Sequence, residues 1–373
     1  MKVLFISYAE AHSNKWVNAL CQKGHEVFFV MQKSHVNHVE KLDSRVIVIE
    51  LPIRGKKGYV LNAGVLKRIV KRISPDVVNV HYGSGYGLLA RLANVKNEVL
   101  TVWGSDVYDF PYESPIKNII IKRNLRHAKI ITTVSDNLVV QVEKLIGKCD
   151  NVFITHFGED TEYFSRKRFE NVKKDRDVIL IGNIKAITPK YGIDDLINAF
   201  ELLRKDLQAN KETEKYAHIV RCVIYGPGEL RQNMIDLVKE KKLEGYISLP
   251  GEVSYEEIPK LMSEMDIFCC TSVLDSDAFG VVVVDAEAMS LPVVATDVAG
   301  FKEVVEDGIT GIIVEKRNVT EIANALKILV IDENLRRTMG ERGRKRFENK
   351  YDFKKNVEEM ERAYKAALGN SKI

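Results

Sequence analysis

The stretch from residue 275 to residue 297 decides the fold. It reads Asp275-Ser276-Asp277-Ala278-Phe279-Gly280, then VVVVDAEAMS over 281–290, then Leu291-Pro292-Val293-Val294-Ala295-Thr296-Asp297. Four consecutive valines favour a strand by propensity. We predict a helix there instead, because the apolar run at 293–296 is the better strand and a parallel strand needs a crossover element before it. The stretch therefore predicts a loop, a helix and a buried strand of a parallel α/β sheet.

The start of this predicted helix offers a site for an anion. The backbone N–H groups of Phe279, Gly280 and Val281 would lack acceptors within the helix, and the helix dipole adds positive character. Asp277 stands just before the helix, and Asp285 about two turns further along. Donors for a diphosphate beside acceptors for hydroxyl groups suit a sugar nucleotide.

The same stretch resembles a family signature. An acid, seven intervening residues and a second acid, with Phe-Gly after the first acid and Pro-Val-Val-Ala-Thr-Asp behind, is similar to the family 4 retaining glycosyltransferases of GT-B fold, the glycogen synthase and sucrose synthase-like group. Most members carry glutamate at both acidic positions and glycine at the position of Ser290. The aspartates here are each one methylene shorter. The resemblance covers nearly the whole chain and is strongest over 178–314.

The resemblance implies an α/β fold of GT-B type. Two Rossmann-like, doubly wound parallel-sheet domains are expected to face each other across a cleft. Residues 1–168, completed by a C-terminal helix at 352–373, would bind the acceptor, and 169–351 would bind the nucleotide sugar. By resemblance Asp277 and the amides of Phe279, Gly280 and Val281 hold the sugar, and Asp285 the ribose hydroxyls. Retention of anomeric configuration is implied by the family alone.

A loop in the second half adds positive charge. Gly182-Asn183-Ile184-Lys185 follows a predicted strand, and Pro189-Lys190-Tyr191-Gly192 opens a helix. The family has Gly-Arg and then Lys-x-Gly here, and its arginine and lysine hold the donor's phosphates. Lys190 matches, whereas Asn183 replaces the arginine, whose charge is either lost or supplied by Lys185. The predicted donor-binding residues of this half therefore include Gly182, Asn183, Lys185 and Lys190, together with Gly226 and Val253 near the nucleoside.

The first half alternates apolar strands with helices, which predicts a parallel sheet covered on both faces. Ligands of such sheets bind beyond the carboxyl ends of the strands. The residues expected on the acceptor side are His81, Trp103, Ser105 and Asp106. Asp106 is the acid expected closest to the acceptor, with a turn-capping aspartate as an equal alternative. Lys190, Asp277 and Asp106 are the predicted catalytic residues.

Length and composition set the class of protein. The 373 residues suit two α/β domains, and 45% hydrophobic with 29% charged residues is ordinary for a globular protein. No apolar run reaches the roughly 20 residues of a membrane span. The five cysteines form no Cys-x-x-Cys pair, which is typical of reduced thiols in a cytoplasmic protein.

The net charge of +4 is distributed unevenly. Residues 1–170 hold 25 Lys and Arg against 17 Asp and Glu, and the remainder holds 31 against 35. The basic half is expected to meet something anionic, but few aromatic residues and no known motif argue against nucleic acid. Isoleucines alternate with Lys and Arg over 115–129, as in a helix lying on an anionic membrane and equally in an ordinary surface helix. We therefore expect a cytoplasmic protein, with peripheral attachment to the inner face of the plasma membrane as its predicted membrane contact.

These features together predict a retaining glycosyltransferase. It would move a sugar from a nucleotide-diphospho-sugar, with UDP expected, to a saccharide or lipid-linked saccharide acceptor in cell-surface polysaccharide or glycan assembly. Asp275-Ser276-Asp277 spells the Asp-x-Asp of metal-dependent enzymes, but the helix N-terminus and Lys190 already supply positive charge, so no metal or other cofactor is expected. Two alternatives stay open: a nucleotide-sugar-binding protein without transferase activity, and a nucleotide-sugar 2-epimerase of GT-B fold.

Overall fold

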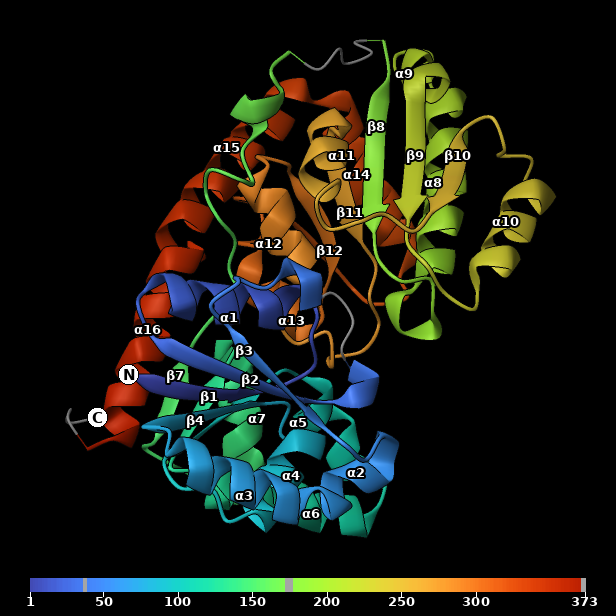
Figure 1. The fold of residues 1–373 in the computed structure, drawn as a ribbon. Helices are drawn as coiled ribbons and strands as arrows, with labels where there is room; N and C mark the ends of the chain where they lie inside the picture. Colours follow the sequence, from blue (N-terminus) through green and yellow to red (C-terminus); the bar gives the residue numbers. More distant parts are fainter. Residues whose placement is uncertain (36–38, 172–176, 370–373) are drawn as a thin grey trace. The chain divides into compact units, whose positions relative to one another are not determined.

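The computed structural model describes residues 1–35, 39–171 and 177–369 (Figure 1). The chain divides into two compact units, one made of Met1–Phe157 with Lys354–Ile373 and the other of Gly158–Phe353. The observed boundary, between Phe157 and Gly158, comes earlier in the chain than the boundary expected between residues 168 and 169. Arg166, in the charge-rich segment that suggested this boundary, donates to the carbonyl groups of Ser263 and Met265 and so belongs to the second unit. Residues 172–176 of that segment lie outside the described residues.

The first unit is built on a seven-stranded parallel sheet in the order β3-β2-β1-β4-β5-β6-β7. β4 and β5 are buried along their whole length, as expected for central strands of a covered parallel sheet. The parallel sheet that the alternation of strands and helices predicted for this half is confirmed. The strands are β1 (Lys2–Ile6), β2 (Glu26–Gln32), β3 (Ile47–Leu51), β4 (Val77–His81), β5 (Glu98–Val102), β6 (Ile130–Thr133) and β7 (Val152–Ile154).

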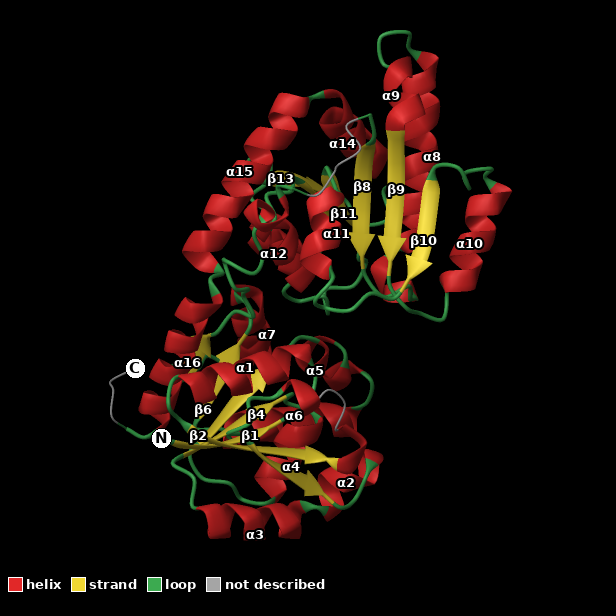
Figure 2. Cartoon of the chain, turned by 45° about the horizontal axis from the view of Figure 1, so that its top comes forward, coloured by secondary structure: helices red, strands yellow, loops and turns green. Residues whose placement is uncertain are grey.

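Helices connect these strands and pack along them (Figure 2). They are α1 (Ala11–Gln22), α2 (Gly55–Leu61), α3 (Ala63–Ile73), α4 (Gly85–Leu92), α5 (Ser105–Tyr108), α6 (Pro115–His127) and α7 (Asp136–Ile146). The predicted return of the C-terminal helix to the first unit is confirmed by α16 (Phe353–Ala367). Its Tyr364 hydroxyl lies 2.8 Å from Asn79 Oδ1, and its Glu361 lies 2.8 Å from His25 Nε2. None of the helices in the described residues is long and apolar enough to cross a membrane.

The second unit is a six-stranded parallel sheet in the order β10-β9-β8-β11-β12-β13. Its strands are β8 (Ile179–Ile184), β9 (Val220–Tyr225), β10 (Ile247–Gly251), β11 (Ile267–Cys270), β12 (Val293–Thr296) and β13 (Gly311–Val314). Its helices are α8 (Ile193–Ala209), α9 (Glu214–Ile219), α10 (Arg231–Glu240), α11 (Ile258–Glu264), α12 (Val281–Ala288), α13 (Ala299–Val304), α14 (Val319–Ile331) and α15 (Glu333–Lys350).

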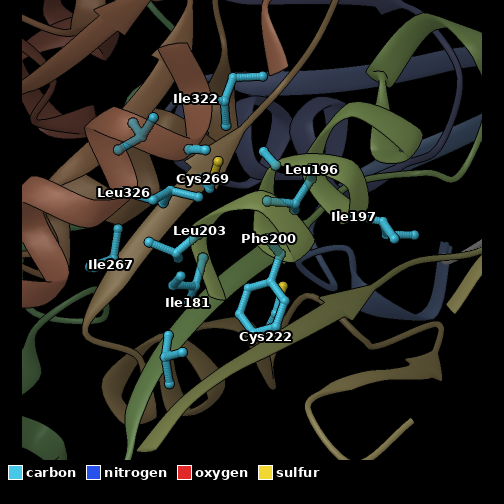
Figure 3. Packing of buried hydrophobic residues seen from close by; sticks show 14 of the residues in the cluster. Ile181, Leu196, Ile197, Phe200, Leu203, Cys222, Ile267, Cys269, Ile322 and Leu326 are labelled. Carbon is cyan, nitrogen blue, oxygen red and sulfur yellow. The ribbon is translucent and has the colours of Figure 1, made fainter. Parts of the chain in front are cut away.

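The core of the second unit packs α8 and α14 against the sheet. Phe200 and Leu203 of α8 lie beside the strand residues Ile181 and Cys222, and Leu326 of α14 completes this side of the cluster (Figure 3). All of these side chains are buried, and each of the Ile, Leu and Phe side chains contributes about 1.5–3 kcal/mol by leaving water. The sheet therefore gives a rigid base to the loops at its carboxyl edge.

The helix predicted at the four valines is confirmed. α12 begins at Val281, directly after Gly280, and is followed by the predicted strand β12. Strand propensity yields here because the chain must cross over between the parallel neighbours β11 and β12. The last two valines of the run, Val283 and Val284, are buried and at most 1% exposed.

Candidate functional site

The loop before α12 is shaped by two glycines. Gly280 has φ +71°, and a Cβ there would lie 2.6 Å from the Phe301 ring. Gly300 of α13 lies so close to the loop that a Cβ would meet the Asp277 carbonyl oxygen at 2.4 Å. Glycine at 280 allows the left-handed conformation, and glycine at 300 allows the close approach of α13 to the loop. The first turn of α12 and the carboxylate just before it are thus fixed in place.

Asp277 forms a buried ion pair with Lys185. The Lys185 Nζ lies 2.7 Å from Asp277 Oδ2, and both side chains are about a tenth exposed, at 11% and 10%. The Ser272 hydroxyl donates to the same oxygen at 2.7 Å. Within the described part of the chain no hydrogen bond reaches Oδ1 of Asp277, so this oxygen remains able to accept one.

Both members of this pair are ionised. Burial would raise the pKa of Asp277, but the Lys185 ammonium and the Ser272 hydroxyl hold that pKa below its usual value. Burial would likewise lower the pKa of Lys185, but the Asp277 carboxylate raises that pKa well above its usual range. The two opposite shifts describe one mutual attraction in a poorly solvated place.

Lys190 adds a second positive charge to the same region. It lies in the short turn Pro189–Tyr191, and its charge also lowers the pKa of Asp277. The two ammonium groups flank one ring, since Lys185 Nζ lies 4.7 Å and Lys190 Nζ 5.6 Å from the centre of Tyr191. The structure therefore brings together Lys185, Lys190 and Asp277, which the sequence assigned to one donor site. The contacts of these residues with a donor stay a prediction.

Gly182 and Asn183 have packing roles that the sequence did not predict. A Cβ on Gly182 would lie 2.0 Å from the Met265 sulfur, so glycine is needed for β8 to pack there. Asn183 is fully buried and donates from Nδ2 to the Cys269 carbonyl oxygen at 2.7 Å, which ties β8 to β11. A donor contact of either residue stays a prediction.

The turn after β9 supports the backbone of Lys185. Gly226 has φ +144°, and a Cβ there would lie 2.0 Å from the Lys185 carbonyl oxygen. The Ile187 amide donates to the Pro227 carbonyl oxygen at 2.6 Å. Gly226 thus lies beside the residues that carry the charge. Val253 lies partly exposed in the loop after β10.

Asp285 lies near a polar pair that sequence reasoning missed. It is 2% exposed on α12, and its charge helps to raise the pKa of Tyr255 after the larger effects of burial and of Glu159. The Tyr255 hydroxyl donates to Glu159 Oε2, and both residues belong to the second unit. No motif marks these two residues, and their separation of 96 positions left no local signal.

The carboxylates of Asp275 and Asp277 have different partners. Asp275 Oδ1 accepts the Ala299 amide at 3.1 Å, at the start of α13, and lies 3.2 Å from Lys316 Nζ. Asp275 therefore caps the start of α13 from outside the helix. Of the two carboxylates in this Asp-x-Asp sequence, that of Asp275 caps α13 and that of Asp277 pairs with Lys185.

In the first unit, His81 is a core residue. It is fully buried, and burial lowers its pKa to about 3. Its Nε2 lies 3.1 Å from Asn79 Oδ1, and its Nδ1 lies 3.2 Å from Trp103 Nε1, which donates. A neutral ring held on both sides serves to orient Trp103.

Asp106 orders the turn after β5. It is fully buried, and burial raises its pKa although backbone N–H groups donate to its carboxylate. Among these donors are the N–H groups of Gly83, Gly104 and Trp103, at 2.7, 2.8 and 3.0 Å. Because backbone amides occupy both oxygens, we give Asp106 the structural role that was its alternative, and it takes no part in the mechanism proposed below.

Trp103 and Ser105 are partly exposed at the carboxyl edge of the first sheet, as expected for the acceptor side. The Ser105 hydroxyl lies 2.7 Å from the Tyr82 hydroxyl. Tyr8 and Tyr82, which follow β1 and β4, lie at the same edge of the sheet. Their clustering with Tyr59 depends on the fold, because Tyr59 lies on α2, 51 positions from Tyr8.

Comparison with known proteins gives the family context. Residues 164–346 match the family described as "Glycosyl transferases group 1", and residues 2–135 match "Glycosyl transferase 4-like". The chain is 22% identical to N-acetyl-alpha-D-glucosaminyl L-malate synthase of Bacillus anthracis, covering 95% of this chain and 92% of that protein. It is 27% identical to an uncharacterized glycosyltransferase of Methanocaldococcus jannaschii, covering 82% and 80%.

Solved structures share the fold. Sucrose-phosphate synthase of Thermosynechococcus elongatus superposes with a TM-score of 0.83 at 17% identity and covers 100% of both chains. Anabaena HepE in complex with UDP has a TM-score of 0.78 at 16% identity, covering 98% of this chain and 100% of that one.

Proposed function

Because the chain belongs to the family 4 glycosyltransferases of GT-B fold, we propose that it transfers a sugar, with retention, from a UDP-sugar to a saccharide or lipid-linked saccharide acceptor. The observation that carries the donor site is the pair Lys185–Asp277 beside Lys190 and the start of α12. UDP as the nucleotide of the donor is supported by the UDP complex of HepE, which shares the fold. A role in surface glycans is supported by a Staphylococcus aureus capsular polysaccharide biosynthesis glycosyltransferase, 29% identical over 259 residues.

In this proposal the diphosphate binds near Lys190 and the first turn of α12. Cleavage of the bond between the sugar and the diphosphate leaves negative charge on the departing phosphate. Fixed cations and helix amides stabilise such charge without reorganising. Lys185 keeps Asp277 ionised, and Oδ1 of Asp277 accepts a hydrogen bond from a sugar hydroxyl. Asp285 accepts from the ribose.

Retention is assigned on family membership. The acceptor hydroxyl attacks the face from which the diphosphate departs, and its proton passes to the departing phosphate oxygen. No base from this chain is required for that transfer, which agrees with the structural role of Asp106.

We also propose that an anionic membrane surface is a partner of the first unit. The apolar residues of α6 divide between two faces. Ile121 and Leu125 are buried, whereas Ile116 and Ile119 are 70% and 50% exposed, beside Tyr112 at 57%. The same helix carries Lys122, Arg123 and Arg126. Exposed isoleucines next to basic side chains suit insertion among anionic headgroups.

The experiment that tests the transfer reaction incubates the full chain with UDP-, GDP- and ADP-sugars. Thermal unfolding reports binding, and mass spectrometry reports released nucleotide and new glycoside. We expect a UDP-sugar to raise the Tm, and we expect transfer of the sugar to an acceptor, with release of UDP, to continue in the presence of EDTA. Strict dependence on Mn²⁺ or Mg²⁺ would contradict the metal-free mechanism. Binding without turnover, or an isomerised sugar nucleotide without release of UDP, would replace transfer by one of the two alternatives.

A further inference from the structure

Four aromatic side chains gather at the carboxyl edge of the first sheet. We call Tyr8, Tyr59, Tyr82 and Trp103 the tyrosine rim. The Tyr8 and Tyr59 hydroxyls lie 2.7 Å apart, and Tyr82 packs edge-on against Tyr8 and Trp103 with ring centres 6.0 and 6.1 Å away. All four side chains are partly exposed. Rings of this kind combine an apolar face with a polar edge.

Tyr82 is held in a conformation that costs energy. Its φ is +79°, which is unfavourable for a bulky side chain. The Tyr82 amide donates to the Thr101 carbonyl oxygen at 2.9 Å, and its hydroxyl lies 2.7 Å from Ser105 Oγ, so the ring is fixed at both ends. Strained residues concentrate where a ligand or reaction needs a particular geometry. The strain at Tyr82 therefore indicates that the orientation of its ring at this edge of the sheet serves a ligand.

The charged groups acting on the rim are acidic. Glu10 and Asp106 raise the pKa of Tyr8, after burial and Tyr59, and Asp106 and Asp109 raise that of Tyr82, after burial. Glu10 Oε1 is buried and has no hydrogen-bond partner in the described part of the chain, and burial raises its pKa to about 7. The acidic groups beside the rim therefore offer acceptors for hydroxyl groups and would repel an anion.

We propose that the tyrosine rim binds the acceptor, and that the accepting ring carries hydroxyl groups and no negative charge. The proposal rests on the transfer reaction above and names the chemical class of its acceptor. Ring C–H groups lie on the aromatic faces, and hydroxyls bond to the tyrosine hydroxyls and to Glu10. A dicarboxylate acceptor such as L-malate would meet acidic groups at this site and would be repelled.

Fluorescence of Trp103 offers a direct test without any donor. The chain has two tryptophans, and Trp16 is buried in the core. The full chain is titrated with methyl α-D-glucoside, methyl N-acetyl-α-D-glucosaminide, glucosamine and L-malate. We expect a saturable change with at least one of the three sugars and none with malate. The change should be absent in Trp103→Phe, which keeps Trp16.

The rim is tested by removing single hydroxyls. Tyr59→Phe should weaken sugar binding about two- to tenfold, the usual effect of one lost hydrogen bond. Tyr216→Phe in the second unit removes a similar hydroxyl, bonded to the Ile331 carbonyl oxygen, and should leave binding unchanged. Glu10→Gln should weaken sugar binding, because it removes a carboxylate acceptor.

Malate binding as tightly as the sugars, or no response to any sugar up to the solubility limit, would overturn the proposal. Equal loss in Tyr59→Phe and Tyr216→Phe would overturn it as well. Binding of UDP to the second unit is measured separately by thermal unfolding. A protein that binds the sugars but no nucleotide would refute the transfer reaction and leave the rim as a saccharide site.

Discussion

The Nζ of Lys185 and Oδ2 of Asp277 lie 2.7 Å apart in a place where both side chains are only about a tenth exposed, at 11% and 10%. By resemblance, the family has glutamate at the position of Asp277 and arginine at that of Asn183, two residues before Lys185. A carboxylate shortened by one methylene is thus accompanied by a lysine that holds one of its oxygens. We infer that the two substitutions are linked.

The first prediction concerns this ion pair. Lys185→Met leaves the Asp277 carboxylate buried without its cation, and breaking such a pair typically costs about 3–5 kcal/mol of unfolding free energy. Lys241→Met, which breaks the more exposed pair with Glu201, should cost about 0–1 kcal/mol. Urea denaturation of both variants measures the difference. Equal losses would show that the Lys185 pair is no more important than a surface pair.

Lys190 should act on the reaction more than on folding. Lys190→Ala removes a charge that stabilises the departing diphosphate, so turnover should fall by roughly a hundredfold or more, about 3 kcal/mol. The Tm should stay within a few degrees of the wild-type value. Lys205→Ala, on an exposed face of α8, is the matched control and should keep full turnover. Wild-type turnover in Lys190→Ala would move the phosphate site elsewhere.

Membrane docking should depend on the exposed isoleucines of α6. The variant with Ile116→Ser and Ile119→Ser should bind anionic liposomes more weakly at every salt concentration, because it loses apolar insertion. Val140→Ser on α7 removes a side chain that is 66% exposed and should bind as the wild type does. Co-sedimentation with vesicles of phosphatidylserine and phosphatidylcholine measures the bound fraction.

The basic residues of α6 provide the second arm of that experiment. Reversing charge at Lys122, Arg123 and Arg126 should abolish binding at low salt, where screening is weak. Wild-type binding should decline as salt is raised. If the reversed variant binds as the wild type does, α6 is an ordinary surface helix.

Glu287 on α12 should make stability depend on pH. It is fully buried, and burial raises its pKa to about 8. A carboxyl whose pKa is raised on folding stabilises the protein below its unfolded pKa, and this contribution is lost as pH rises from about 4.5 to about 8. Glu287→Gln should therefore unfold at higher urea concentration than the wild type at pH 8.5, and the advantage should vanish near pH 4.5. A constant difference across that range would refute the buried, protonated carboxyl.

The sequence was sufficient for the architecture because covered parallel strands leave long apolar runs. Even the α12 helix, which opposes propensity, follows from the need for a crossover before β12. The pairing of Lys185 with Asp277 was beyond sequence reasoning, since the two are 92 positions apart. The faces of α6 were equally undecided, because helical spacing does not tell which isoleucines meet the sheet. Asp106 and His81 have the residue types of a reactive site, and only their complete burial shows that they order the turn and Trp103.

Variants of Asp277, in the loop before α12, and of Asp285, on α12, should differ in how they affect binding of free UDP and of the UDP-sugar. Asp285→Asn should weaken UDP and UDP-sugar alike, because the ribose that it is proposed to bind is common to both. Asp277→Asn should spare UDP and weaken only the intact donor, by about 1–3 kcal/mol for an unpaired group.

Asp277→Glu tests more sharply whether the site is adapted to the shorter acid. Lys185 and Ser272 already hold Asp277 Oδ2 at 2.7 Å, so a longer side chain must break one of these contacts or intrude on the sugar, and transfer should slow. Faster transfer by this variant, measured as UDP release, would mean that the shorter acid is a loss of function and not half of an adapted pair.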